Sequence, residues 1–350
     1  METEKETINH SHQQPSLPEI THLVISGGGP SFLQVLGNIQ ALEGAIIDPK
    51  KIKAIYASSS GAIVALFFCI YRDMGFTWEE INTYIIQRPW QDVFPMKMDS
   101  ILSAYSKRGM FDVKNITQVF ASFFNAKYIS TNITLREFYD AICRIELHFC
   151  VLDINQFQLE DISYLTHPDV SLFQAILMTC AIPIIFTPVI MNNSGNGGVG
   201  GVGVGVGVGV DDIGNNVKKT KKENQQTKCY IDGGVIMNYP LKLCLGLNND
   251  IKKENILGFK NKYDREKVVG QTSYVTEEST LFDFMMTFCF RVIHQMENKE
   301  VFDIPYEIEN ETDFLDAEYI KNALFLKEFR AELIEKGRKV GQEFAQSINK

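Results

Sequence analysis

The sequence has no apolar run long enough to cross a membrane, and its first residues lack the apolar core of a signal peptide. The two longest apolar runs cover residues 62–71 and 281–293, and the second contains Asp283 and Arg291. We therefore expect a soluble cytoplasmic protein without a transmembrane segment, and leave peripheral attachment to membranes open.

An excess of positive charge is also missing. The net charge of −9 argues against nucleic acid as a partner, because phosphate binding needs a basic face. The seven cysteines show no C-x-x-C spacing, and several lie in apolar runs, which is typical of buried reduced thiols. No H-x-x-x-H or equivalent cluster is present. We expect neither a metal nor a cofactor.

What is present is an ordinary globular composition, with 45% hydrophobic and 22% charged residues in 350. Residues 1–20 are polar with few apolar anchors and predict a disordered tail. Residues 21–345 are expected to form one domain. A low-complexity insert interrupts it at 193–227, where Gly-Val repeats precede a lysine-rich run.

The first third of the domain alternates between strand and helix. Across residues 22–71 the order is strand, glycine turn, helix, strand, serine turn and helix. This alternation predicts an α/β fold with a mostly parallel central sheet flanked by helices, whose sites lie at the carboxyl ends of strands.

Helix-capping signals and apolar runs locate the later elements. Thr77, Asp112 and Thr134 are positioned to cap helices that cover the sheet, and Thr134 with Glu137 forms a capping box. Further predicted elements are a strand at 148–155, a helix at 171–180 ended by Pro183, a strand at 255–259, a helix at 279–298 and a helix from 316 onward.

The second strand runs directly into a helix through Ala57, Ser58, Ser59, Ser60 and Gly61. This is the setting of a nucleophile elbow of G-x-S-x-G type, in which a strained turn exposes a serine at the edge of a sheet. Only Ser59 has glycine two places after it and a small residue two places before it, so Ser59 is the candidate nucleophile. A plain helix start is the alternative.

Gly27, Gly28 and Gly29 follow the first strand and precede a helix. Their N–H groups can point into one concave site, which suits an oxyanion or a phosphate. A nucleotide-binding protein is a weak hypothesis, because G-K-[ST] is absent and Phe32 breaks G-x-G-x-x-G. A purely structural glycine turn is the other alternative.

The candidate base is Asp232, which ends a short apolar strand and precedes Gly233 and Gly234. A carboxylate there can face a neighbouring strand end. The alternative is an ordinary Asp-Gly turn. His294 is the only histidine after Asp232 and would complete a triad in the order serine, aspartate, histidine.

Taken together, these blocks resemble the patatin-like phospholipase family. The chain has SGGGPSFLQVLGNIQALEG as a glycine-rich block, ASSSGAIVAL as an elbow, SLFQAILMTCAIPIIFTPV before the insert, and YIDGGVIMNYPL as a D-G-G block with N-x-P. The resemblance covers about residues 20–245 and implies a three-layer patatin-like fold. It also implies a Ser–Asp dyad, in which Ser59 attacks an acyl ester, Asp232 is the base, and Gly27 to Gly29 form the oxyanion hole. The implied partner is a phospholipid or other acyl lipid at a membrane or micelle surface.

The chain departs from the family pattern at three positions. Ser31 and Phe32 stand where the family has a basic residue and a glycine, and Ala57 stands where the elbow opens with glycine. A catalytically degenerate member that binds lipid or protein is therefore the second hypothesis.

We predict that deletion of residues 195–226 leaves the melting temperature within a few degrees of wild type. Glycine-rich repeats and a lysine run bury little surface, and the entropic cost of loop closure grows slowly with length. Differential scanning calorimetry of the two proteins checks this, and loss of soluble protein on deletion would show that the repeats pack as structure.

Overall fold

The computed structural model describes residues 19–95, 104–192, 227–247, 250–262, 303–313 and 317–348, with a few further positions between 275 and 291. Most of the predicted tail, most of the insert and most of the predicted helix at 279–298 lie outside these residues. Within the described part of the chain, no helix combines the length and the hydropathy needed to span a bilayer.

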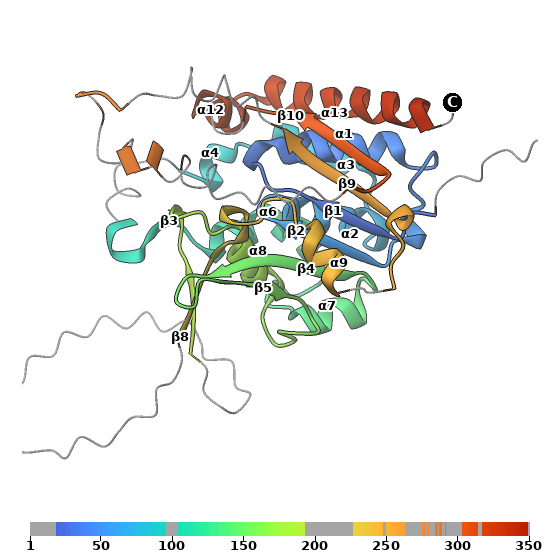
Figure 1. Ribbon diagram of the computed structural model, residues 1–350. Helices are drawn as coiled ribbons and strands as arrows, with labels where there is room; N and C mark the ends of the chain where they lie inside the picture. The colour runs from blue at the N-terminus through green and yellow to red at the C-terminus, as the bar shows by residue number, and fades with distance from the viewer. Residues whose placement is uncertain are drawn as a thin grey trace, which may run out of the picture.

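A mixed sheet of eight strands forms the centre of the described structure, in the order β10-β9-β1-β2-β4-β8-β7 with β5 attached to β4 (Figure 1). Its strands are β1 (His22–Ile25), β2 (Ala54–Ser58), β4 (Glu146–Asp153), β5 (Gln158–Ile162), β7 (Val189–Asn192), β8 (Thr227–Asp232), β9 (Ile256–Lys262) and β10 (Tyr306–Glu311). The five strands from β10 to β4 pair in parallel. β3 (Gly109–Phe111) and β6 (Ile184–Phe186) form a separate parallel pair.

The register around β4 places two strands end to end. Residues 149–153 of β4 pair with β5, so β5 occupies one edge of this strand. Ser58 of β2 pairs with Cys150 and Asp232 of β8 pairs with Val151, so both of these strands must use the other edge. β2 is parallel to β4 and β8 is antiparallel to it. The carboxyl ends of β2 and β8 therefore meet over the middle of β4.

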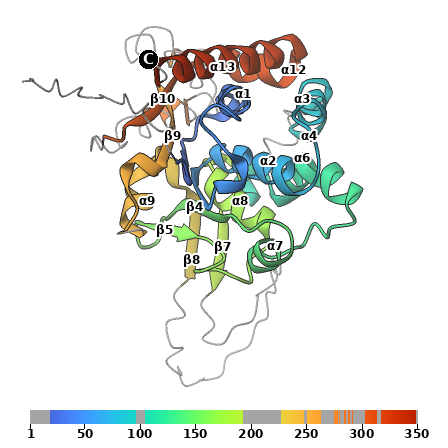
Figure 2. The same ribbon diagram turned by 90° about the vertical axis from the view of Figure 1, so that its right-hand side faces the viewer.

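Helices cover the two faces of the sheet unequally. One face carries the main hydrophobic core, and the other carries a small cluster that packs against α9 (Leu241–Leu247). Figure 2 shows α9 on one side of the sheet and α2, α3 and α6 on the other. The remaining helices are α1 (Phe32–Leu42), α2 (Gly61–Asp73), α3 (Trp78–Gln87), α4 (Trp90–Val93), α6 (Val113–Ala126), α7 (Leu135–Ala141), α8 (Leu172–Cys180), α12 (Ala317–Phe325) and α13 (Lys327–Ile348). The α/β three-layer architecture predicted from the sequence is confirmed.

Most local predictions agree with the structure. Thr77, Asp112 and Thr134 each cap a helix through a capping box, and Ser171 caps α8. The predicted carboxyl-terminal helix is instead two helices, α12 and α13, separated at Leu326. β5 and β10 were not predicted, because their sequences QLEDI and YEIENE carry too many charges to show an apolar alternation.

The helices α1 and α13 lie along each other at the top of the molecule (Figure 1). Glycines make this close packing possible: a Cβ added at Gly37 would lie 2.0 Å from the carbonyl oxygen of Ile334. One added at Gly337 would lie 1.9 Å from that of Gln34. The Asn38 side chain donates to the carbonyl of Gly337 at 2.8 Å and accepts from Asn310 of β10. The last helix is thereby joined to the helix that follows the glycine turn.

We predict that Gly37→Ala lowers the free energy of unfolding by about 1–3 kcal/mol, because the added methyl group forces two helix backbones apart. Urea denaturation checks this. The matched control is Gly246→Ala in α9, where a Cβ meets nothing within 4 Å. That variant should be as stable as wild type or slightly more stable, and equal losses in both variants would contradict the packing argument.

Candidate active site

Ser59 lies in a strained turn between β2 and α2. Its φ is +51°, in the left-handed region that residues with a side chain rarely adopt. The Ser59 N–H donates to Thr179 Oγ1 at 2.9 Å, and Thr179 Oγ1 donates to the carbonyl of Cys150 at 2.7 Å. Thr179 of α8 thus ties the turn to β4. Two residues later α2 begins at Gly61, and the positive end of its dipole lies beside the serine.

Gly61 is required by the closeness of this turn to β1. A Cβ at Gly61 would lie 2.7 Å from the carbonyl oxygen of Ile25. Ala57, in contrast, is fully buried in the main core on the other side of the turn. The alanine that departs from G-x-S-x-G is therefore accommodated by ordinary packing.

The glycine run lies directly against the serine. A Cβ at Gly27 would lie 2.7 Å from the Cβ of Ser59 and 2.6 Å from Oδ1 of Asn238. Gly28 and Gly29 have φ of +154° and +51°, which a glycine adopts without strain. The Gly27 N–H donates to the carbonyl of Asn238 at 3.1 Å. Among the described residues, no acceptor lies within hydrogen-bond distance of the N–H groups of Gly28 and Gly29.

Asn261 of β9 holds this glycine turn in place. Its Nδ2 donates to the carbonyl of Gly27 at 2.7 Å and to Oγ of Ser31 at 2.8 Å. Ser31 in turn donates to the carbonyl of Gly28 at 2.8 Å. Both side chains are buried. The serine found in place of the family's basic residue is therefore an internal part of the turn.

Asp232 is buried at the end of β8, and the next residues turn sharply away. A Cβ at Gly233 would lie 2.4 Å from the carbonyl oxygen of Cys150, so this turn passes close to β4. One Asp232 oxygen accepts from the Gly234 N–H at 2.7 Å. Burial raises the pKa of Asp232 to about 7, although hydrogen bonds from the Ser59 side chain and the Gly234 N–H act in the opposite direction. A serine side chain thus lies beside a buried carboxylate whose pKa is close to neutral pH.

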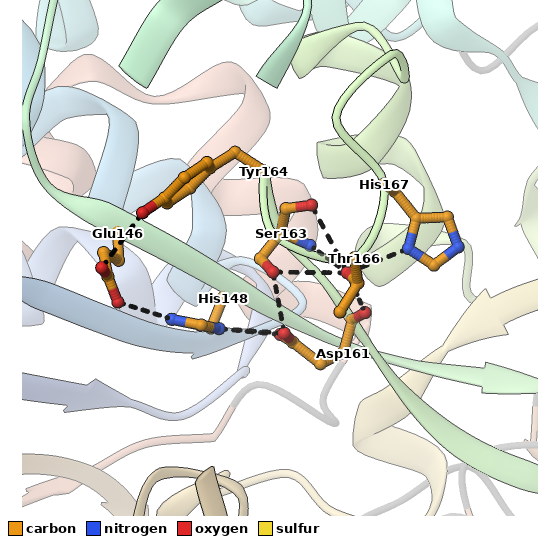
Figure 3. A network of polar contacts seen from close by, with 7 residues as sticks. All are labelled: Glu146, His148, Asp161, Ser163, Tyr164, Thr166 and His167. Carbon is orange, nitrogen blue, oxygen red and sulfur yellow. Dashed lines mark hydrogen bonds and ion pairs between the residues drawn. The ribbon is translucent and has the colours of Figure 1, made fainter. Parts of the chain in front are cut away.

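A second polar cluster contains serine, histidine and acidic residues but has a different connectivity (Figure 3). His148 of β4 lies between Asp161, at 3.0 Å, and Glu146, at 3.6 Å, and Ser163 Oγ donates to Asp161. The aspartate bridges serine and histidine here, whereas in a triad the histidine must bridge. Burial lowers the pKa of His148, but the hydrogen bonds and charges of Asp161 and Glu146 outweigh it and raise the pKa to about 9. An imidazole already protonated at neutral pH cannot act as a base.

The structure brings some of the predicted site residues together and does not describe others. Ser59, Asp232 and the glycine run come together, although they are far apart in the sequence. His294 lies outside the described residues. In the part of the chain that the structure describes, no group of three histidine, cysteine or acidic side chains could hold a metal ion.

Three side chains at the site did not emerge from the sequence as functional candidates. Asn238 and Thr179 lie inside the blocks that carry the family resemblance, so position alone could have drawn attention to them. Asn261 lies beyond those blocks and has no local signal. It reaches the glycine turn only because β9 pairs with β1.

Comparison with known proteins shows the family to which the chain belongs. The family model described as patatin-like phospholipase matches residues 23–245, which contain the glycine run, the elbow and the Asp-Gly-Gly turn.

Two viral proteins are similar in sequence. "Probable lipid hydrolase 463L" of Invertebrate iridescent virus 6 is 26% identical over 234 residues, which are 66% of this chain and 66% of that protein. An uncharacterized protein of Acanthamoeba polyphaga mimivirus is 24% identical over 194 residues, 54% of this chain and 62% of that protein. The chain thus spans about two thirds of the length of the curated relatives that it matches.

Among solved structures, VipD from Legionella pneumophila is similar, with 16% identity and a TM-score of 0.44. The match covers 94% of this chain and 67% of VipD.

We predict that Asn261→Ala lowers the free energy of unfolding by about 1–3 kcal/mol, because Ser31 Oγ loses its donor and the carbonyl of Gly27 keeps only the longer bond from Asn238, at 3.3 Å. Asn261→Asp, which has the same size but no N–H donor, should be at least as unstable. Urea denaturation measures both variants. The control is Asn255→Ala, which removes one exposed hydrogen bond, to the carbonyl of Glu19, before the same strand. It should cost little, and an equal loss in the control would mean that the glycine turn does not depend on Asn261.

Proposed function

The chain belongs to the patatin-like phospholipase family, and on this premise we propose that it is a lipid acyl hydrolase acting through a Ser59–Asp232 dyad. Its substrates are fatty-acyl esters of phospholipids or related lipids at a membrane or micelle surface. The observation that carries the proposal is the meeting of the two strand ends that bear Ser59 and Asp232, a buried carboxylate whose pKa burial raises to about 7.

In this proposal the reaction has two halves. Asp232 accepts the proton of Ser59 Oγ while the oxygen attacks the ester carbonyl, and the N–H groups of Gly28 and Gly29 stabilise the oxyanion. Collapse of the tetrahedral intermediate breaks the ester bond, and the departing alcohol takes the proton from Asp232. A water molecule, deprotonated by Asp232, then attacks the acyl-enzyme. Asp232 returns this proton to Ser59 Oγ as the acyl–oxygen bond breaks, which releases the fatty acid and regenerates the dyad.

The three glycines have different parts in this mechanism. Gly27 donates its N–H to Asn238, and its lack of a side chain allows the turn to lie against Ser59. Gly28 and Gly29 keep their N–H groups for the substrate oxygen. Developing charge on that oxygen also benefits from the amino terminus of α2.

A degenerate, non-hydrolytic member is the alternative suggested by Ser31, Phe32 and Ala57. The packing of these residues favours an active enzyme. Ser31 hydrogen-bonds within the turn, Ala57 fills the core, and Phe32 begins α1 and packs against the same core. None of these side chains displaces the serine, the carboxylate or the glycine backbone.

We predict that Ser59→Ala and Asp232→Asn each lower kcat by several orders of magnitude, because the two residues act as one unit. The measurement is release of fatty acid from phospholipid micelles, together with mapping of a fluorophosphonate adduct, expected on Ser59. His294→Gln tests the triad alternative and should be nearly as active as wild type. A folded but inactive His294→Gln protein would restore a histidine base, and an active Asp232→Asn protein would remove Asp232 from the mechanism.

The pH dependence supplies a second readout of the same variants. Since only the ionised carboxylate accepts a proton, kcat/KM should rise with pH and level off above the pKa of about 7.

The pH dependence of stability should also depend on Asp232. Its pKa in the folded protein lies above the ordinary value of 3.8, so folding favours the protonated form. Protonation of Asp232 therefore contributes fully to the free energy of unfolding below about pH 4, and this contribution is lost as the pH rises through about 7. Asp232→Asn should abolish this loss, a change that urea denaturation detects without any assay of activity.

A further inference from the structure

A pocket of about 560 Å³ opens at the amino ends of β2 and β4, where these strands begin. Ser59 follows the other end of β2. The five residues of β2 separate the two places by about 17 Å, at about 3.3 Å per residue. The pocket is therefore distinct from the candidate active site.

Positive charge predominates in the lining of this pocket. Four cationic side chains line it, and only two carboxylates accompany them. The cations are Lys50, Lys53, Arg72 and Arg144. The lining thus carries two more positive than negative side chains, although Arg144 also pairs outside it with Asp140, at 3.2 Å.

Both carboxylates of the lining have partners within the protein. Asp73 forms an ion pair with Arg72, whose Nε lies 2.6 Å from Oδ2. Glu146 accepts from the Tyr164 hydroxyl at 3.1 Å and lies 3.6 Å from Nε2 of His148 (Figure 3). His148 is a buried cation that also lies 3.0 Å from Asp161, so it offsets the charge of Glu146 only in part.

The two lysines of the lining, Lys50 and Lys53, do not have such partners among the described acidic side chains. In the described part of the chain, neither Lys50 nor Lys53 has an acidic side chain within ion-pair distance. Lys51, which stands between them in sequence, does not line the pocket and pairs with Glu19 at 3.4 Å. Two ammonium groups are thus free to bind a ligand at the mouth of the pocket.

The remaining lining limits how a ligand can lie. Arg72 is fixed, since its guanidinium also donates to the carbonyl of Ile52 at 3.1 Å. Arg144 lies over the ring of Tyr139, 5.3 Å from its centroid. The buried Ile52 and the ring of Tyr139 add apolar surface beside the cations. The lining therefore suits an anionic group attached to a less polar body.

We propose that this pocket binds the phosphate group of a phosphate monoester, either a soluble ester or the headgroup of a lipid such as phosphatidic acid. Such a group carries about 1.5 to 2 negative charges at neutral pH, which matches the two lysine ammonium groups that have no acidic partner in the described part of the chain. Its three terminal oxygens can accept from several lysine and arginine donors at once.

The test is isothermal titration calorimetry of the full chain with inorganic phosphate and with glycerol phosphate. The double variant Lys50→Gln/Lys53→Gln should weaken binding about tenfold or more, as expected for lost charge-assisted hydrogen bonds. Lys51→Gln is the matched control, because it removes the same charge from the neighbouring position and should bind as wild type does. A melting curve of each variant verifies folding.

Two results would overturn the proposal: no binding of either ligand to the wild-type chain, or equal weakening by Lys51→Gln, which would indicate only a diffuse charge effect.

Sedimentation with phosphatidylcholine vesicles, with and without phosphatidic acid, identifies the source of the phosphate. This arm uses Ser59→Ala so that the lipids are not consumed. Vesicle binding lost in the double variant assigns a lipid headgroup, and phosphate binding without vesicle binding assigns a soluble ester. Acyl hydrolysis is not measured in any arm, so failure here leaves the proposed function untouched.

Discussion

The arrangement of the site depends on how one edge of β4 is shared. β2 and β8 approach along this edge from opposite directions, and their carboxyl ends meet at Cys150 and Val151. Ser59 follows one strand and Asp232 ends the other. Neither strand could extend by two residues without colliding with its counterpart, so both must turn away. Small residues are needed at the junction because the turning backbones pass within contact distance of β4 and β1.

The pKa values of Asp232 and Glu146 shift in opposite directions, although burial acts to raise both of them. Asp232 is surrounded by neutral hydrogen-bond donors, so loss of solvation dominates and raises its pKa. Glu146 has a buried imidazolium beside it, and the hydrogen bond from His148 lowers its pKa. A carboxylate of the first kind can exchange a proton near neutral pH, whereas one of the second kind stays ionised and holds a neighbouring cation in place. Carboxylates of this one protein thus have a pKa near neutrality at one place in the sheet and a lowered pKa at another.

Much of the fold could be predicted from local patterns. The strand-turn-helix succession at 22–71 and the capping residues Thr77, Asp112 and Thr134 depend on neighbours within a few positions, and these predictions agree with the structure. The antiparallel direction of β8 could not be predicted, because it depends on the path of the chain between β7 and β8. The same limit applies to the site. Ser59, Asp232 and the glycines follow from motifs, whereas Asn261 is placed by pairing between strands more than two hundred residues apart. Their chemical roles are proposals that rest on this convergence.

The glycine-lined contact between α1 and α13 bears on how the chain acquires its structure. β1 lies between β2, which follows it closely, and β9, which belongs to the last third of the chain. α1 likewise packs on a helix that ends at Ile348. Contacts of such long sequence separation give a high contact order, which slows folding. On the ribosome, the amino-terminal half emerges with one edge of β1 unpaired and the glycine face of α1 uncovered. These surfaces are closed only after β9 and α13 have been synthesised, so this region cannot mature as an autonomous early unit.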